Sequence, residues 1–178
     1  SSAASDVYKR QVYTFLSKDE NPNRKKLLFS LALKDAKDLK ASVLEDHLDC
    51  EQGDLPEEIF RKDLLCPRIF LEELTPYRSM IRGFFEEETK RSFAEQPERI
   101  LDYLKKNITF HPEEEYDTIM ATPVGVLTMK QGSPLAQKIL FVAICRSLNV
   151  AARLNPVTLE PEYYRCLLYT SPSPRDTR

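Results

Sequence analysis

Leucine and valine recur at three- and four-residue spacings in two stretches near the start of the chain. RKKLLFSLALKD (24–35) and AKDLKASVLEDHL (36–48) follow this pattern, which is typical of amphipathic helices. A further helix is expected from about Pro97, because the apolar residues after it again share one side. The chain has few glycines and little strict alternation of apolar and polar positions, so we predict that it is mainly helical.

Two hydroxyl–proline pairs indicate where helices begin. In Thr75-Pro76 and Ser133-Pro134 the hydroxyl can cap backbone amides, and proline suits the first helical turn. We expect the helix after Thr75-Pro76 to run towards Phe93. Ser133-Pro134 introduces LAQKILFVAICRSLNV, which is apolar on nearly all faces from Ile139 to Cys145. A helix with that pattern belongs at the centre of a domain.

Prolines and acidic stretches separate these helices. Residues 51–58 (EQGDLPEE) are a predicted linker, in which Pro56 can begin the next helix. Cys66-Pro67 should end or kink that helix, and the acidic stretch 111–117 is a predicted loop. Asn149 can end the central helix in a left-handed conformation, and the sequence after it is typical of extended or turn-like structure.

The two ends of the chain share one short DNA word. GATGTGTATAAGAGACAG encodes DVYKRQ (6–11), and its reverse complement, read one base in, encodes CLLYTS (166–171). The word resembles the transposase end sequence of sequencing-library adapters. We therefore interpret 1–11 and 165–178 as adapter-derived, and 12–164 as a truncated fragment of the metagenomic kind. Two unrelated natural tails are the alternative.

Charge and cysteine content narrow the range of partners. The two adapter-like ends carry five basic and two acidic residues, so without them the formal charge changes from −2 to −5. This balance disfavours nucleic acid or an anionic membrane as the main partner. No apolar run reaches the ~20 residues of a membrane span. The remaining cysteines show no spacing of metal ligands, so we expect no metal.

The stretch 121–164 resembles the transglutaminase-like superfamily, in a bacterial branch. Family members have a motif similar to R-S-x-G-I-P-A-R at the end of a buried helix, and residues 146–153 read RSLNVAAR. Upstream, 55–78 resembles the family's helical lead-in, and 98–110 resembles the helix before the catalytic loop. The resemblance implies an incomplete α+β domain with a papain-like core over 55–164, preceded by a helical lead-in over 12–54, in a predominantly α-helical fragment.

The family's chemistry requires a cysteine thiolate at the start of the buried helix, with a histidine as base and an Asp or Asn to orient it. Counted back from the closing motif, the nucleophile position falls on Pro134, which cannot attack a carbonyl. Ser133 is one position away and is a candidate nucleophile, although a role as helix cap explains it fully. Cys145 lies three turns into the helix and is expected to be a buried core residue.

The remaining chemistry-bearing residues have simpler interpretations. His111, beside Glu113, Glu114, Glu115 and Asp117, is expected in a solvated acidic loop, and His47 is expected to be exposed on a helix surface. Arg78 and Arg82, with Tyr77, are interpreted as a helical stripe of surface ion pairs. Arg153 is expected to donate its guanidinium to carbonyls or a carboxylate near the central helix.

Three hypotheses follow for the function. The leading hypothesis is a degenerate, non-catalytic member that keeps the fold and binds a peptide, protein or glycan without a cofactor. The second is a hydrolase or acyltransferase acting on amide or peptide bonds through a displaced nucleophile such as Ser133. It needs a histidine and an acid beyond Tyr164. The third is a helical interaction module whose likeness to the family is due to chance.

Overall fold

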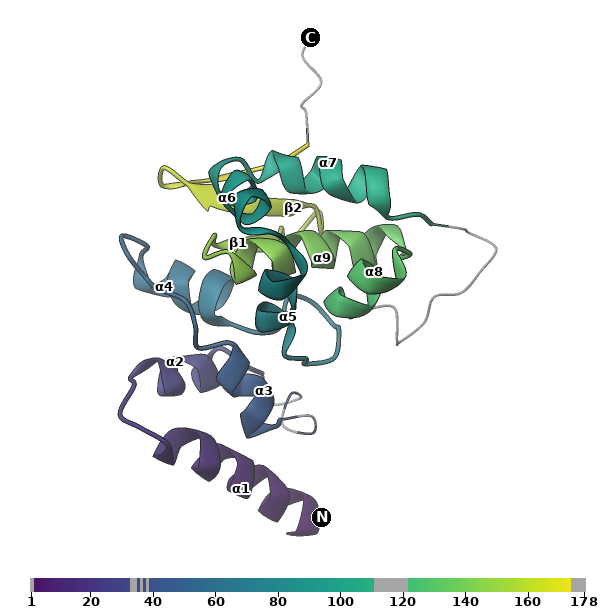
Figure 1. Cartoon of the computed structure of the whole chain (residues 1–178). Coiled ribbons are helices and arrows are strands. Elements are labelled where there is room, and N and C mark those ends of the chain that lie inside the picture. Colours follow the sequence, from purple (N-terminus) through teal and green to yellow (C-terminus); the bar gives the residue numbers. More distant parts are fainter. Residues whose placement is uncertain (1, 33–34, 36, 38, 111–121, 174–178) are drawn as a thin grey trace. The chain divides into compact units, whose positions relative to one another are not determined.

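The computed structural model describes residues 2–32, 35, 37, 39–110 and 122–173 (Figure 1). The chain divides into two compact units, Ser1–Pro76 and Tyr77–Arg178, which are treated separately below. Helices predominate among the described residues, and three strands form one antiparallel sheet. The predicted α+β class, in a mainly helical chain, is therefore confirmed.

The first unit is helical throughout its regular structure. Its elements are α1 (Ser2–Ser17), α2 (Asn23–Phe29), α3 (Ala41–Asp46), α4 (Glu57–Phe60) and the π-helix η2 (Arg61–Leu65). As predicted, Pro56 directly precedes a helix and the regular structure stops at Cys66, before Pro67. The apolar side chains that are fully shielded from solvent are Phe15, Leu27, Leu44, Phe60, Leu64 and Leu65.

Two predicted helices of this unit are shorter than their apolar periodicity suggests. The prediction for 24–35 is wrong in extent, because α2 ends at Phe29. The Ser30 hydroxyl donates to the carbonyl of Leu27 at 2.5 Å and helps to end the helix. The prediction for 36–48 is wrong at its start, because Lys40 is extended and α3 begins at Ala41. Residues 33, 34, 36 and 38 lie outside the described residues.

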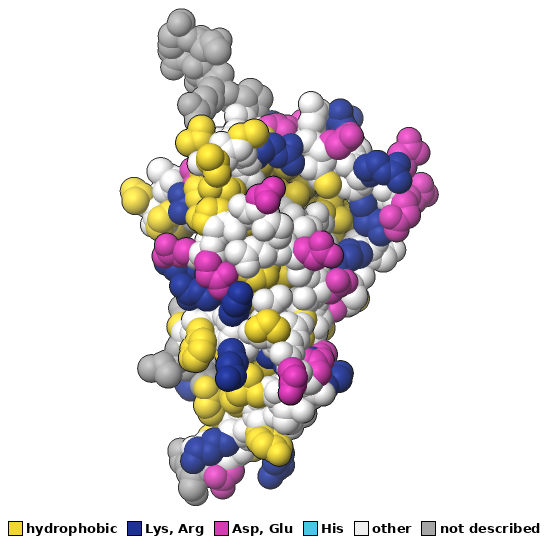
Figure 2. All heavy atoms as spheres, turned by 90° about the vertical axis from the view of Figure 1, so that its left-hand side faces the viewer, with side chains coloured by type: hydrophobic (Ala, Val, Ile, Leu, Met, Phe, Trp, Pro, Cys, Tyr) yellow, Lys and Arg dark blue, Asp and Glu magenta, His cyan; other side chains and the backbone are white. Residues whose placement is uncertain are grey.

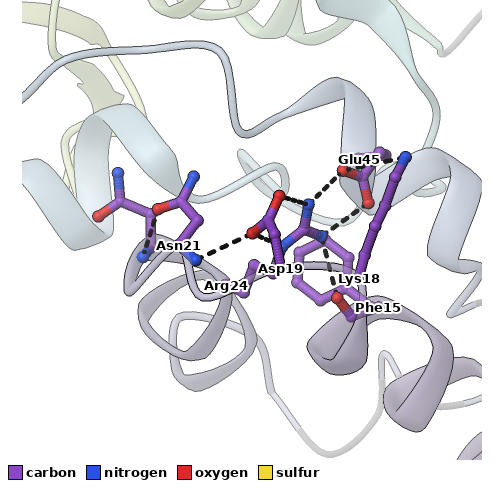
Figure 3. Close-up of polar contacts among 7 residues, drawn as sticks. Phe15, Lys18, Asp19, Asn21, Arg24 and Glu45 are labelled. Atoms are coloured by element: carbon purple, nitrogen blue, oxygen red, sulfur yellow. Dashed lines mark hydrogen bonds and ion pairs between the residues drawn. The ribbon is translucent and has the colours of Figure 1, made fainter.

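A buried arginine connects α1, α2 and α3 (Figure 3). Arg24 is 3% exposed, and its guanidinium donates to both carboxylate oxygens of Asp19 and both of Glu45, at 2.6–3.0 Å. It also donates to the carbonyl of Phe15 at 2.9 Å and lies over that residue's ring. These bonds satisfy a charge that would otherwise be costly to bury. The Arg24 guanidinium holds the pKa of Asp19 at about 2 and lowers the pKa of Glu45.

The second unit is built around one apolar helix. Its helices are α5 (Tyr77–Phe84), α6 (Glu87–Glu95), α7 (Glu98–Asn107), α8 (Pro123–Met129) and α9 (Pro134–Ser147). Helix α9 packs against α5, α7, α8 and two strands, and Figure 1 shows it among them. Every residue from Ile139 to Ser147 is buried. The prediction of a central helix introduced by Ser133-Pro134 is confirmed.

The predicted helix from Thr75-Pro76 towards Phe93 is interrupted. Helix α5 begins at Tyr77 as expected, but it stops at Phe84, and Glu86 is extended before α6 begins. The break lets Phe85 turn inward, where its ring meets those of Phe93 and Tyr103 edge-on at 5.1–5.2 Å. Burial of the Phe85 ring thus stabilises the fold more than a continuous helix would at this point.

A small antiparallel sheet follows α9. Strand β1 (Ala152–Leu154) pairs with β2 (Pro161–Arg165), and β2 pairs with β3 (Leu168–Thr170). Along β1 and β2 buried positions alternate with less buried ones, as expected for strands with one face on a core. Strand β3 lies within the stretch interpreted as adapter-derived, and that interpretation stays a prediction.

Charges of both signs mix on one face of the molecule. Figure 2 shows one face on which Lys or Arg side chains alternate with Asp or Glu side chains. Interspersed charges of this kind create no extended field of a single sign. No described helix is both long and apolar enough to cross a bilayer.

Candidate functional site

The start of α9 is the position at which the sequence analysis expected chemistry. Ser133 is the N-cap, with extended backbone, and its hydroxyl oxygen accepts a hydrogen bond from the Ala136 amide at 3.1 Å. Pro134 occupies the first helical position and is exposed. The predicted cap is therefore confirmed, and its geometry satisfies one of the unpaired amides at the helix start.

Two backbone hydrogen bonds hold the loop that leads into α9. The Gly132 amide donates to the carbonyl of Thr109 at 3.0 Å, and the Thr109 amide donates to the carbonyl of Lys130 at 3.0 Å. The Gln137 side chain donates to the carbonyl of Gly132 at 2.9 Å. Gly132 also lacks space for a side chain, since a Cβ there would lie 2.9 Å from Val126 Cγ1. The loop between α8 and α9 is thereby fixed at both ends.

Arginines surround the opposite end of α9. Arg78 is fully buried and donates to the carbonyl of Arg146 at 3.2 Å, while Arg82 Nε donates to the carbonyl of Ser147 at 2.8 Å. The last carbonyls of a helix lack intrahelical donors and carry partial negative charge, so guanidinium groups stabilise them. The interpretation of Arg78 as a surface residue is wrong, because its side chain is fully buried; for Arg82, which is half-buried, the ion-pair interpretation stays a prediction. Their acceptors lie 65 to 68 residues later in the chain.

The residues after α9 turn back onto its last turn. Asn149 has a φ of 63°, as predicted for a left-handed stop, and the Val150 amide donates to the carbonyl of Cys145 at 2.9 Å. Arg146 Nε donates to the carbonyl of Ala152 at 3.0 Å. Arg153 pairs with the carboxylate of Glu162 on β2 at 3.0 Å, so the expected carboxylate partner is confirmed.

The arrangement of a capped helix start, a buried helix and a closing arginine motif agrees with the family comparison. Residues 78–161 match the model of the transglutaminase-like superfamily. This segment belongs to the transglutaminase-like superfamily. The match runs from the second residue of α5 to the first residue of β2. No curated protein and no solved structure matches the chain.

The described residues of the transglutaminase-like segment offer no activated thiol. Cys145 is the cysteine within α9, eleven residues or about 16 Å along the axis from Pro134. It is fully buried, as predicted, and burial raises the pKa of its thiol well above the usual range. A thiol that stays protonated at neutral pH is a poor nucleophile.

Of the chain's two histidines the structure describes one, His47. His47 is fully buried in the first unit, where Nε2 lies 2.8 Å from the carbonyl of Thr75. The prediction of an exposed His47 is wrong, because α3 ends at Asp46 and His47 turns into the interior as its C-cap. His111 and its acidic neighbours lie outside the described residues. The described side chains contain no group of three or more potential metal ligands.

An apolar cavity lies beside the start of α9 in the transglutaminase-like segment. Its volume is about 280 Å³, and residues of α7, α9 and β2 form its walls. The apolar pattern after Pro97 predicted a helix with one apolar side but not this cavity. The missing information is tertiary, since nothing in the local pattern says which face of α9 lies opposite α7.

Proposed function

We propose that this chain contains a catalytically degenerate transglutaminase-like domain that binds a peptide. The observation that carries the proposal is Pro134, which occupies the first turn of α9 where the resemblance places the nucleophile. Its ring has no atom that can attack a carbonyl. The helix start and the loop before it are nevertheless fixed by hydrogen bonds. A domain without the nucleophile therefore still has a surface that can bind a ligand.

The neighbouring groups support a non-catalytic role. The Ser133 hydroxyl accepts the Ala136 amide and so already acts as the helix cap. To act as a nucleophile it would also need a base within hydrogen-bond reach. The described part of the second unit contains no histidine. The Cys145 thiol is sealed inside the core.

A reactivity experiment separates this proposal from a hydrolase that uses Ser133. The chain is incubated with a fluorophosphonate, which labels activated serines, and labelled residues are located by mass spectrometry. We expect no label on Ser133. Labelling of Ser133 in the native chain, lost on S133A, would replace the proposal with the displaced-nucleophile enzyme.

A second variant asks whether Pro134 occupies a former nucleophile position. P134C is made in a C50S/C166S background, which removes the more accessible thiols, and its iodoacetamide rate is followed against pH. We expect an apparent pKa below the ~8.5 of a free cysteine, because helix N-terminal amides stabilise a thiolate. The matched control is M129C, because Met129 is 58% exposed and lies at the C-terminal end of α8. The pKa of its thiol should not be lowered. Equal values for the two thiols would count against the assignment.

A further inference from the structure

The cavity beside the start of α9 has an apolar base and a polar rim. Phe141 and Leu104 are buried and form its inner part. Leu101, Pro161 and the exposed Pro134, at the proposed former nucleophile position, also line it. At about 280 Å³ the cavity is at the small end of ligand sites, which suits one or two side chains rather than a whole cofactor.

The charged residues lining the cavity are both lysines. Lys105 is exposed at the C-terminal end of α7 and forms no ion pair within the described residues. Lys138 on α9 also lines the cavity, and its ammonium group lies 2.8 Å from the carboxylate of Glu160. An apolar cavity with two ammonium groups at its rim is complementary to an apolar side chain next to a carboxylate.

We propose that this cavity binds an extended acidic peptide, with an aliphatic or proline side chain against Phe141 and an adjacent carboxylate on Lys105. The inference rests on the proposed non-catalytic function and specifies the chemistry of its ligand. A peptide fits better than a glycan, because sugar rings stack on exposed aromatic faces and the lining aromatic ring here, that of Phe141, is buried. Lys138 serves as a second anchor once it leaves Glu160.

The test uses the acetylated and amidated peptide Glu-Leu-Pro-Leu-Glu, titrated into the isotope-labelled full chain and followed by amide chemical shifts. We expect shifts at residues of α7 and α9, with a Kd that weakens at least fivefold in K105E. K106E is the matched control, since Lys106 is an exposed neighbour on α7 that does not line the cavity. Its Kd should stay within twofold of the native value. E160Q should bind about twofold to threefold more tightly, because it releases Lys138.

The outcomes distinguish the ligand proposal from the proposed function. Mass spectrometry of the peptide after incubation shows whether it stays intact, and cleavage would overturn the non-catalytic function itself. An intact peptide that causes no shifts at about 2 mM, or that binds K105E and K106E equally, overturns only the acidic-peptide site. Equal binding of the charge-reversed peptide Lys-Leu-Pro-Leu-Lys would also overturn it. So would shifts caused by a tetramer of N-acetylglucosamine in place of the peptide.

Discussion

Replacing Gly132 by alanine should destabilise the second unit although it adds a single methyl group. The added Cβ would lie 2.9 Å from Val126 Cγ1, 3.2 Å from Val126 Cγ2 and 3.5 Å from the Ala136 Cβ. The glycine backbone cannot move aside easily, because its amide and its carbonyl are both hydrogen-bonded. Overpacking of a core typically costs about 1–3 kcal/mol. The lower entropy of the unfolded alanine chain offsets about 0.4–1 kcal/mol of that cost.

The net expectation is a loss of about 1–2 kcal/mol in the free energy of unfolding, measured by urea denaturation with circular dichroism. G83A is the matched control, because a Cβ at Gly83 meets nothing within 4 Å and Gly83 lies inside α5. Alanine is the better helix former by up to ~1 kcal/mol, so G83A should be neutral or stabilising. The two variants make the same chemical change in opposite packing environments.

A double-mutant cycle with Val126→Ala attributes the effect to the contact itself. V126A removes both methyl groups of a fully buried side chain and should cost about 2 kcal/mol alone. In the double variant the two alanines no longer collide, so the combined loss should fall short of the sum by about 1 kcal/mol or more. Strict additivity, or a G132A chain as stable as the native one, would refute the close approach of the loop to α8.

Three further changes test other parts of the structure. Arg78→Met should lower the free energy of unfolding by about 2–4 kcal/mol, because it removes hydrogen-bond donors from the buried end of α9. Arg82→Met, at a half-buried position, should lower it by about 1 kcal/mol. Equal losses in urea denaturation would contradict the difference in burial. Asp19 has a folded pKa of about 2 against its usual 3.8, and the pKa of Glu45 is also lowered. The stability that these carboxylates contribute is therefore present above about pH 4.5 and is lost as pH falls towards 2. Thermal melts should show this loss in the native chain and much less of it in R24M. Cys166 and Leu167 have positive φ values, 54° and 67°, a conformation that is unfavourable for residues with a side chain. L167G should therefore stabilise the β2–β3 hairpin by about 1 kcal/mol. The measurement is amide exchange in β3, which should become slower.

The sequence predicted best those features that local chemistry determines. Ser133-Pro134 predicted the start of α9 because a hydroxyl cap and a proline act within one turn. Asn149 predicted the end of that helix because few residues adopt a left-handed conformation readily. The burial of Cys145 followed from a helix that is apolar on all faces. Each of these inferences needed only residues close together in the chain.

The features that were predicted wrongly depend on distant partners. Arg78 looked like a surface residue because its acceptor, the carbonyl of Arg146, lies 68 residues away. His47 looked exposed among acidic neighbours, yet the early end of α3 turned it into the interior. Phe85 interrupted a helix whose periodicity was otherwise continuous, because it packs against Phe93 and Tyr103. Periodicity records which face is apolar but not what lies opposite it.

The proposed non-catalytic function requires that a domain can lose its nucleophile and keep its fold, and the construction of α9 is compatible with this. The groups that hold the helix act at its carbonyl end, where Arg78 and Arg82 bind the last turn, and along its buried middle. At the amide end the Ser133 cap and the Gly132 loop are sufficient, and neither requires a thiol at position 134. Proline at that position even favours helix initiation. The cavity beside it is lined by Leu104 and Phe141, which belong to the core, so it persists for as long as the core does. A ligand site can therefore remain at this helix start after the chemistry is gone, which is the basis on which we expect peptide binding without turnover.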